Sequence, residues 1–195
     1  MNTFGQSCFL KRMREVTPVS DETAALLAEY LTECCFEKRD IVLKAGYFCK
    51  YVWLIESGMV RHYWMVDGNE IVTSFSLEGQ VIFSMDELYF GKKSQEYAQA
   101  VEPIEAYRIS VKDMNRLLST NLELCNWGRL IHQFEYRRIH QSHKERLTLA
   151  AKDRYLAFTQ EFPEVCRRAN LYDIASYLGI TPSTLSKMRM KLRDV

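Results

Sequence analysis

The chain has 195 residues, of which 47% are hydrophobic and 26% charged, and its net charge is +1. This is the composition of an ordinary soluble globular protein, and no apolar run reaches the ~18 residues of a membrane span. The N-terminal residues 1–13 lack the apolar core and small-residue cleavage site of a signal peptide. We therefore expect a cytoplasmic protein without a membrane partner.

The first elements in chain order are a helix and then a series of strands. Ser20 can cap a helix whose apolar face is Ala24, Leu27 and Leu31. From Asp40 onward the sequence is rich in β-branched and aromatic residues between turn signals, and Asp67-Gly68 is a strong hairpin signal. The expected strands are 41–44, 51–56, 59–66, 70–76, 81–84, 97–101 and 106–109. They predict an antiparallel β-barrel or jelly-roll domain over residues 1–120.

A long helix should follow, over residues 121–144. After a short helix at 111–118, Leu124, Trp127, Ile131 and Phe134 recur at steps of three and four. We interpret this seam as the contact between two copies of the chain in a homodimer; the alternative is that it packs on the barrel of its own chain. Residues 129–162 contain no Pro or Gly, so we expect a stiff helical connection until Phe162-Pro163 ends a helix at 148–161.

The last segment, residues 145–195, should be a small helical domain with a helix-turn-helix. Ile174, Ala175 and Leu178 form the inner face of a first helix, and Gly179 can adopt the left-handed conformation that ends it. Thr181 is a good N-cap and Pro182 suits the first position of a second helix. Leu185, Met188 and Leu192 should pack that second helix against the first.

The opposite face of the second helix has the chemistry of a DNA-reading surface. At 100° per residue its central stripe is Ser183, Lys187 and Met190, and it contains no acid before Asp194. Short hydroxyl groups can reach base edges in the major groove, while Lys and Arg contact phosphates. The predicted DNA-binding residues are Thr181, Pro182, Ser183, Thr184, Ser186, Lys187, Arg189 and Lys191.

The distribution of charge supports this interpretation. Residues 1–136 carry a net charge of −5, whereas residues 137–195 carry +6, from 12 basic and 6 acidic residues. An acidic body joined to a basic end favours a polyanion as the partner of that end. Double-stranded DNA is therefore the expected partner.

Taken together, these segments resemble the Crp/Fnr-type transcriptional regulators. Residues 40–47 and 51–61 resemble the opening strands of the family's cyclic-nucleotide-binding-like barrel, the seam falls where the family has its dimer helix, and residues 174–186 resemble its DNA-reading motif, particularly in Bacteroidetes-type members. The resemblance implies a homodimer on a two-fold operator. It also implies base-reading roles for Pro182, Ser183 and Lys187, and a phosphate contact for Thr184, although Pro182 cannot hydrogen-bond a base edge.

The sensor segment departs from the family pattern. Residues 82–100 contain no Arg to pair a cyclic phosphate, Glu87 has no preceding Gly, and Glu96 lies near the place of the cation. We therefore expect no dependence on a cyclic nucleotide in the family's usual manner. Ser84, Glu87, Glu96 and Tyr97 remain candidate contacts for an effector of another kind.

The sequence gives little support for a metal site, a cofactor site or a catalytic site. The six cysteines form no CxxC pair, and His140 with His143 has no third ligand nearby, so we expect reduced thiols, no metal and no cofactor. No base or nucleophile accompanies the acid pair Asp86-Glu87, which argues against an enzyme. The prediction is an α+β regulator; the alternatives are an effector-dependent sensor with a ligand in the barrel, or a protein-docking module that binds no DNA.

Overall fold

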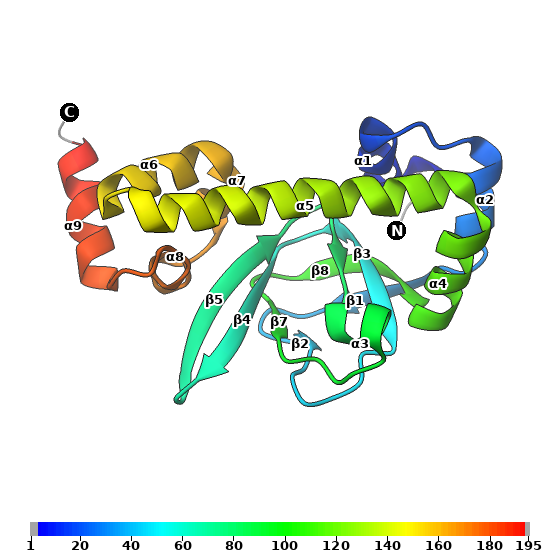
Figure 1. Cartoon of the computed structure of the whole chain (residues 1–195), viewed down its shortest axis with the longest axis horizontal. Coiled ribbons are helices and arrows are strands. Elements are labelled where there is room, and N and C mark those ends of the chain that lie inside the picture. Colours follow the sequence, from blue (N-terminus) through cyan, green and yellow to red (C-terminus); the bar gives the residue numbers. More distant parts are fainter. Residues whose placement is uncertain (1–3, 194–195) are drawn as a thin grey trace.

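The computed structural model describes residues 4–193, and the side chains of residues 4–191. Figure 1 shows α5 (Leu122–Thr148) running along the length of the molecule, with the N-terminal helices and α4 at one end and α6 to α9 at the other. The β-strands lie beside the middle of this helix. The C-terminal helices are therefore held away from the N-terminus.

The strands form two four-stranded antiparallel sheets, with the orders β1-β8-β3-β6 and β2-β7-β4-β5. This confirms the expected antiparallel barrel-like domain within an α+β fold. The bounds are β1 Thr32–Phe36, β2 Ile41–Leu43, β3 Tyr51–Ser57, β4 Val60–Val66, β5 Asn69–Ser76, β6 Val81–Ile82, β7 Tyr97–Ala100 and β8 Ile104–Ser110.

Alternation along the strands decides which side chains fill the barrel. Ile55, Val60, Ala98 and Ala100 are buried in a single core between the two sheets, because successive side chains of a strand point to opposite faces. The predicted hairpin joins β4 to β5, and both Asp67 (φ 49°) and Gly68 (φ 78°) adopt the positive φ that this turn needs.

The helices differ from expectation mainly at the N-terminus. The predicted helix after Ser20 is present, and the Thr23 amide donates to the Ser20 hydroxyl at 3.2 Å. Strand β1 and helix α1 were not predicted; α1 buries Phe9, Leu10 and Met13 against the outside of the barrel. The bounds are α1 Cys8–Val16, α2 Asp21–Ala28, α3 Met85–Phe90, α4 Val111–Thr120, α6 Ala151–Glu161, α7 Pro163–Arg168, α8 Leu171–Leu178 and α9 Pro182–Arg193.

The expected continuous helical connection is interrupted. Leu149 and Ala150 have extended backbone with ψ of 144° and 157°, so the helix predicted from Thr148 begins at Ala151 instead. This turn lets α6 place Tyr155 and Phe158 in the core of the C-terminal helices. The sequence shows no sign of this break, because neither Pro nor Gly marks it. The packing of α6 against its neighbours accounts for the break instead. The proposed domain divisions at 120/121 and 144/145 stay predictions.

Among residues 4–193, no helix combines the length and the apolar character that a bilayer crossing requires.

Candidate nucleic-acid interface

Helices α8 and α9 are joined by a tight turn built from local signals. Gly179 has φ +66° and donates to the Ser176 carbonyl, while Ile180 donates to the Ala175 carbonyl, which together end α8. The Thr184 amide then donates to the Thr181 hydroxyl at 3.1 Å, capping α9. Ala175 and Leu185 are fully buried where the two helices cross. The geometry is therefore that of two short helices that cross and are joined by a tight turn.

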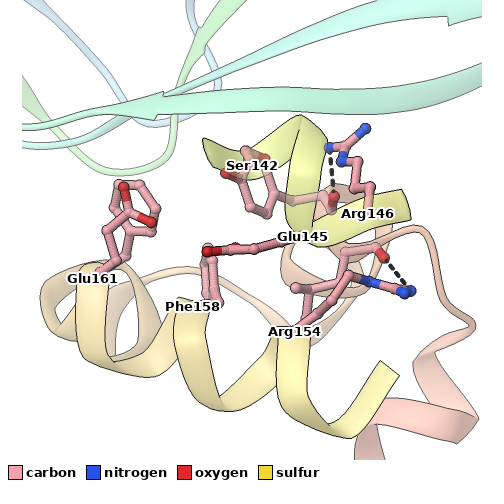
Figure 2. Close-up of a pocket in the computed structure, with 9 residues that line it drawn as sticks. Ser142, Glu145, Arg146, Arg154, Phe158 and Glu161 are labelled. Carbon is pink, nitrogen blue, oxygen red and sulfur yellow. Dashed lines mark hydrogen bonds between the residues drawn. The ribbon is translucent and has the colours of Figure 1, made fainter. Parts of the chain in front are cut away.

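Two arginines hold the end of α8 in place. Arg146 of α5 donates to the Tyr177 carbonyl at 2.9 Å, and Arg154 of α6 donates to the Leu178 carbonyl at 3.2 Å. Figure 2 shows these side chains at the small pocket between the end of α5 and α6. Cations stabilise the free carbonyls at a helix C-terminus. They therefore fix the position from which the turn starts and α9 projects.

The outer face of α9 is open to solvent. Of the predicted DNA-binding residues, Thr181, Ser183, Thr184, Ser186, Lys187 and Lys191 are exposed, and Pro182 is partly exposed. Hydroxyl groups lie over the first turn and cations over the later turns, so the face can offer short donors and positive charge to one surface. The structure thus gathers these predicted residues in one place.

Arg189 differs from its neighbours on α9. Its Nε donates to the Tyr155 hydroxyl at 3.1 Å, and its guanidinium lies 5.8 Å from the centre of that ring. This contact with α6 makes Arg189 a weaker candidate for reaching DNA than Lys187. Met188 packs on the C-terminal core, as predicted, whereas the side chain of Leu192 lies outside the described residues.

The first helix of the motif is docked against the barrel, which sequence reasoning missed. Arg61 of β4 pairs with Asp173 of α8 at 2.8 Å, and the Ser176 hydroxyl bridges the Val72 amide and the Glu70 carbonyl. Burial raises the pKa of the Asp173 carboxyl, and the charge of Arg61 opposes that shift. No local pattern links residues so far apart, so the sequence held no signal for this contact.

A second ion cluster joins the barrel to α7. The Arg168 guanidinium donates to both oxygens of Glu78 and also pairs with Glu102. Hydrogen bonds to these two carboxylates raise the pKa of Arg168. Burial alone would raise the pKa of Glu78, but hydrogen bonds from Arg168 and the Gly58 amide outweigh it and hold the value below normal. The C-terminal helices therefore meet the barrel through two separate charged contacts, in addition to a shared apolar core that includes Val72 and Phe75 of the barrel.

The four candidate effector contacts fall into two pairs, Ser84 and Glu87 at the start of α3, and Glu96 and Tyr97 at the start of β7. The Ser84 hydroxyl caps α3, accepting from the Glu87 amide at 3.3 Å. Tyr97 stacks on Tyr63 at 5.1 Å and packs against the core of the C-terminal helices. Glu96 accepts from the Thr73 hydroxyl at 2.6 Å and lies 3.6 Å from a ring nitrogen of His62.

The predicted seam on α5 is divided between two environments. Leu124 and Trp127 are buried against the N-terminal helices of their own chain, and Trp127 meets Phe9 edge to face. Ile131 packs at the edge of the same core. Phe134 keeps 54% of its surface exposed. Packing within the chain, the alternative interpretation of the seam, therefore accounts for its first three residues.

Comparisons with known proteins support the fold. Residues 33–121 match the family described as the cyclic nucleotide-binding domain. No curated protein matches the chain in sequence. Among solved structures, FixK2 from Bradyrhizobium japonicum aligns with a TM-score of 0.70 at 21% identity, over 84% of this chain and 85% of its own.

Two further structures align over most of both chains. A putative transcriptional regulator of the Crp/Fnr family from Eubacterium rectale has a TM-score of 0.71 at 14% identity, over 92% of this chain and 88% of its own. The c-di-GMP responsive global regulator CLP from Xanthomonas campestris has a TM-score of 0.69 at 16% identity, over 90% and 92%. The chain therefore shares the fold of these structures, in which a domain similar to the cyclic nucleotide-binding domain is followed by C-terminal helices.

Proposed function

We propose that the chain is a homodimeric transcriptional regulator that binds specific sites on double-stranded DNA through α9. The observation that carries this proposal is the outer face of α9, where exposed hydroxyls and then exposed lysines follow a capped N-terminus. Such a helix suits the major groove, because short polar side chains reach base edges while cations neutralise phosphates. Similar structures include a putative transcriptional regulator and a global regulator, which agrees with this role.

Dimerisation would use the exposed surface of α5. Leu122, Phe134, Tyr136, Ile139 and Leu147 are all large and exposed along this helix. A monomer rarely leaves so many large apolar groups on one element without a partner. Two copies would place two α9 helices about one DNA turn apart, each reading one half of a two-fold site.

Independence of cyclic nucleotides is a further part of the proposal. Glu96, near the place where a cyclic phosphate would need a cation, is held by Thr73 and His62. Burial alone would raise its pKa, yet the bonds to His62 and Thr73 keep that pKa below normal. A carboxylate that stays ionised here would repel a phosphate.

The test is binding to a random pool of labelled duplexes, measured over a range of salt concentrations. Affinity should fall steeply with the logarithm of salt, and the enriched sequences should show two-fold symmetry. Lys187→Ala should lower the salt slope by about one, since one phosphate would no longer be neutralised. Lys38→Ala removes an equally exposed lysine from the barrel and should change neither quantity.

Two outcomes would contradict the proposal. Failure to bind any duplex at low salt would assign the C-terminal helices to docking a protein. A rise in melting temperature with a cyclic nucleotide would show that the barrel holds this ligand in spite of Glu96.

A further inference from the structure

An apolar cavity of about 240 Å³ lies between the barrel and the helices α3, α4 and α5. Its inner wall consists of Val52, Leu88, Met114 and Trp127, which are all buried. An engineered cavity of ~150 Å³ lined by apolar side chains stays dry and admits benzene. The cavity here is open to solvent on one side, but its lining is likewise apolar and suits an apolar occupant.

The cavity lies outside the barrel, not in its interior. Val52 belongs to the core shared with α1 and α5, whereas its neighbour Trp53 belongs to the core between the two sheets. Alternate residues of a strand face opposite sides. The side chain of Val52 therefore faces the helices, and the cavity that it lines lies on the outer side of the sheet. Phe83, Leu88 and Tyr89 of the segment where a cyclic nucleotide was considered line this cavity, whereas Ser84 and Glu96 do not.

The surface of the cavity is almost wholly apolar, but some residues that line it carry polar or charged groups. Cys125, Arg129 and Tyr89 line it and are exposed, and Tyr89 hydrogen-bonds His132 across the gap between α3 and α5. Arg129 donates to the neutral Gln133 at 3.1 Å and has no carboxylate partner among the described residues. The described lining contains no acidic residue. An anion beside Arg129 would therefore meet a free cation and no repulsion.

We propose that this cavity binds a small amphipathic carboxylate, with its apolar body against Trp127 and its carboxylate at Arg129. By volume, and scaled from benzene in a cavity of ~150 Å³, the site holds a body of about nine or ten heavy atoms. A guanidinium pairs a carboxylate through two parallel hydrogen bonds, which gives Arg129 the role of selecting the acid.

The ligand would also act on the DNA-binding end of the chain. Trp127, Arg129 and Ile131 lie on α5, and the far end of the same helix holds the α8 terminus through Arg146. Binding would fix the position of α5 against the barrel, and thereby the spacing of the two α9 helices in a dimer. This regulatory step rests on the proposed function, whereas the binding site does not.

Titration calorimetry with octanoate, using 1-octanol as a neutral probe of the same length, tests the binding site. Octanoate should bind saturably. Arg129→Gln should lower the affinity for octanoate about tenfold, while it changes the affinity for 1-octanol less than twofold. Arg137→Gln removes an exposed cation from the same helix and should leave both affinities unchanged. Leu118→Phe, which fills the cavity, should abolish binding of both.

Several results would overturn the proposal. Absence of saturable binding of octanoate would refute it, as would equal affinity in the wild type and Arg129→Gln. Binding that appears only when the protein is diluted to a monomer would assign the cavity to a side chain of a second copy. Arg129 is on the surface, so its variant remains informative even if Leu118→Phe does not fold.

Regulation is measured separately, as the change in duplex affinity on adding octanoate. A change of at least threefold that Arg129→Gln removes supports the link to DNA. If octanoate binds saturably in calorimetry but the affinity for the duplex does not change, the link to DNA is overturned, whereas the binding site is still supported. If no duplex binds at all, the proposed function fails, and calorimetry still decides the binding site.

Discussion

Arg61 of β4 and Asp173 of α8 form an ion pair that joins the barrel to the C-terminal helices, with 2.8 Å between Nη1 and Oδ1. The two side chains keep only 14% and 8% of their surface exposed. Arg61 also pairs with Glu70 at 2.6 Å, and Asp173 accepts a hydrogen bond from the side chain of Asn170. The orientation of α8, and with it of α9, therefore depends on a charge in the barrel.

Removing Arg61 should destabilise the protein and loosen α8. Breaking one partner of a buried pair typically costs about 3–5 kcal/mol, because the other charge is left unpaired. We expect Arg61→Met to approach this loss in urea unfolding and to weaken binding to DNA. The double variant Arg61→Met/Asp173→Asn should recover much of the stability, since the charge left without Arg61 is that of Glu70, which keeps 43% of its side chain exposed. If the two single changes instead add up in the double variant, the pair does not couple the two elements.

The ion cluster at Glu78 predicts a loss of stability in acid. A carboxyl whose folded pKa is depressed contributes stability above its normal pKa, and this contribution is lost as pH falls through the folded value. The pKa of Glu78 is depressed in this way by Arg168, so the protein should lose stability as pH falls below about 4.5, the normal value. Urea midpoints at pH 7 and pH 4 should differ less in Glu78→Gln than in the wild type.

Asp173 should act in the opposite direction. Its folded pKa is raised, so its contribution to stability is largest below its normal pKa and declines as pH rises past it. Asp173→Asn should therefore make the fall in acid steeper, whereas Glu78→Gln makes it shallower. Equal pH profiles for the two variants would contradict both assignments.

The cap of α9 should be worth about 1 kcal/mol, the usual value for such a hydroxyl. Thr181→Ala removes the oxygen that accepts from the Thr184 amide, so it should lower the free energy of unfolding by that amount and weaken DNA binding. Thr181→Ser keeps the oxygen and should restore stability. Thermal unfolding with both variants measures the difference, and a Ser variant as unstable as the Ala variant would rule out the cap.

The exposed side of α5 should hold the dimer together. Ile139 keeps 58% of its surface exposed, so Ile139→Asp should leave the fold of one chain intact while it weakens dimerisation about tenfold or more, as a charge buried in an interface does. Tyr172→Asp changes a large residue on α8 that is 71% exposed and serves as the control. Sedimentation equilibrium gives the dimer dissociation constant; if neither variant changes it, α5 does not form the interface.

Cysteine reactivity should follow burial. Burial raises the pKa of the Cys34 thiol to about 11, so at pH 8 very little of it is the reactive thiolate. Cys125 is exposed on α5 and should be alkylated by iodoacetamide well before Cys34. Peptide mass spectrometry after a short exposure gives the order, and octanoate should slow the reaction of Cys125 alone.

The elements that depend on neighbouring residues could be predicted from the sequence. Asp67-Gly68 forms its hairpin, Gly179 ends α8, and Thr181 with Pro182 begins α9, because each depends on backbone preferences and hydrogen bonds that reach no more than about four residues along the chain. The strand pattern likewise predicted the antiparallel barrel, since alternation of side chains is a local property.

Tertiary structure alone decided which surfaces meet. The periodicity of α5 marked Leu124 and Trp127 as a buried seam, but only the position of α1, which places Phe9 against Trp127, shows that their own chain covers them. The pairing of Arg61 with Asp173 spans 112 positions of sequence, and the cavity at Arg129 forms where separate elements pack imperfectly. Contacts of this kind arise from the packing of whole elements, so no local pattern of residues encodes them.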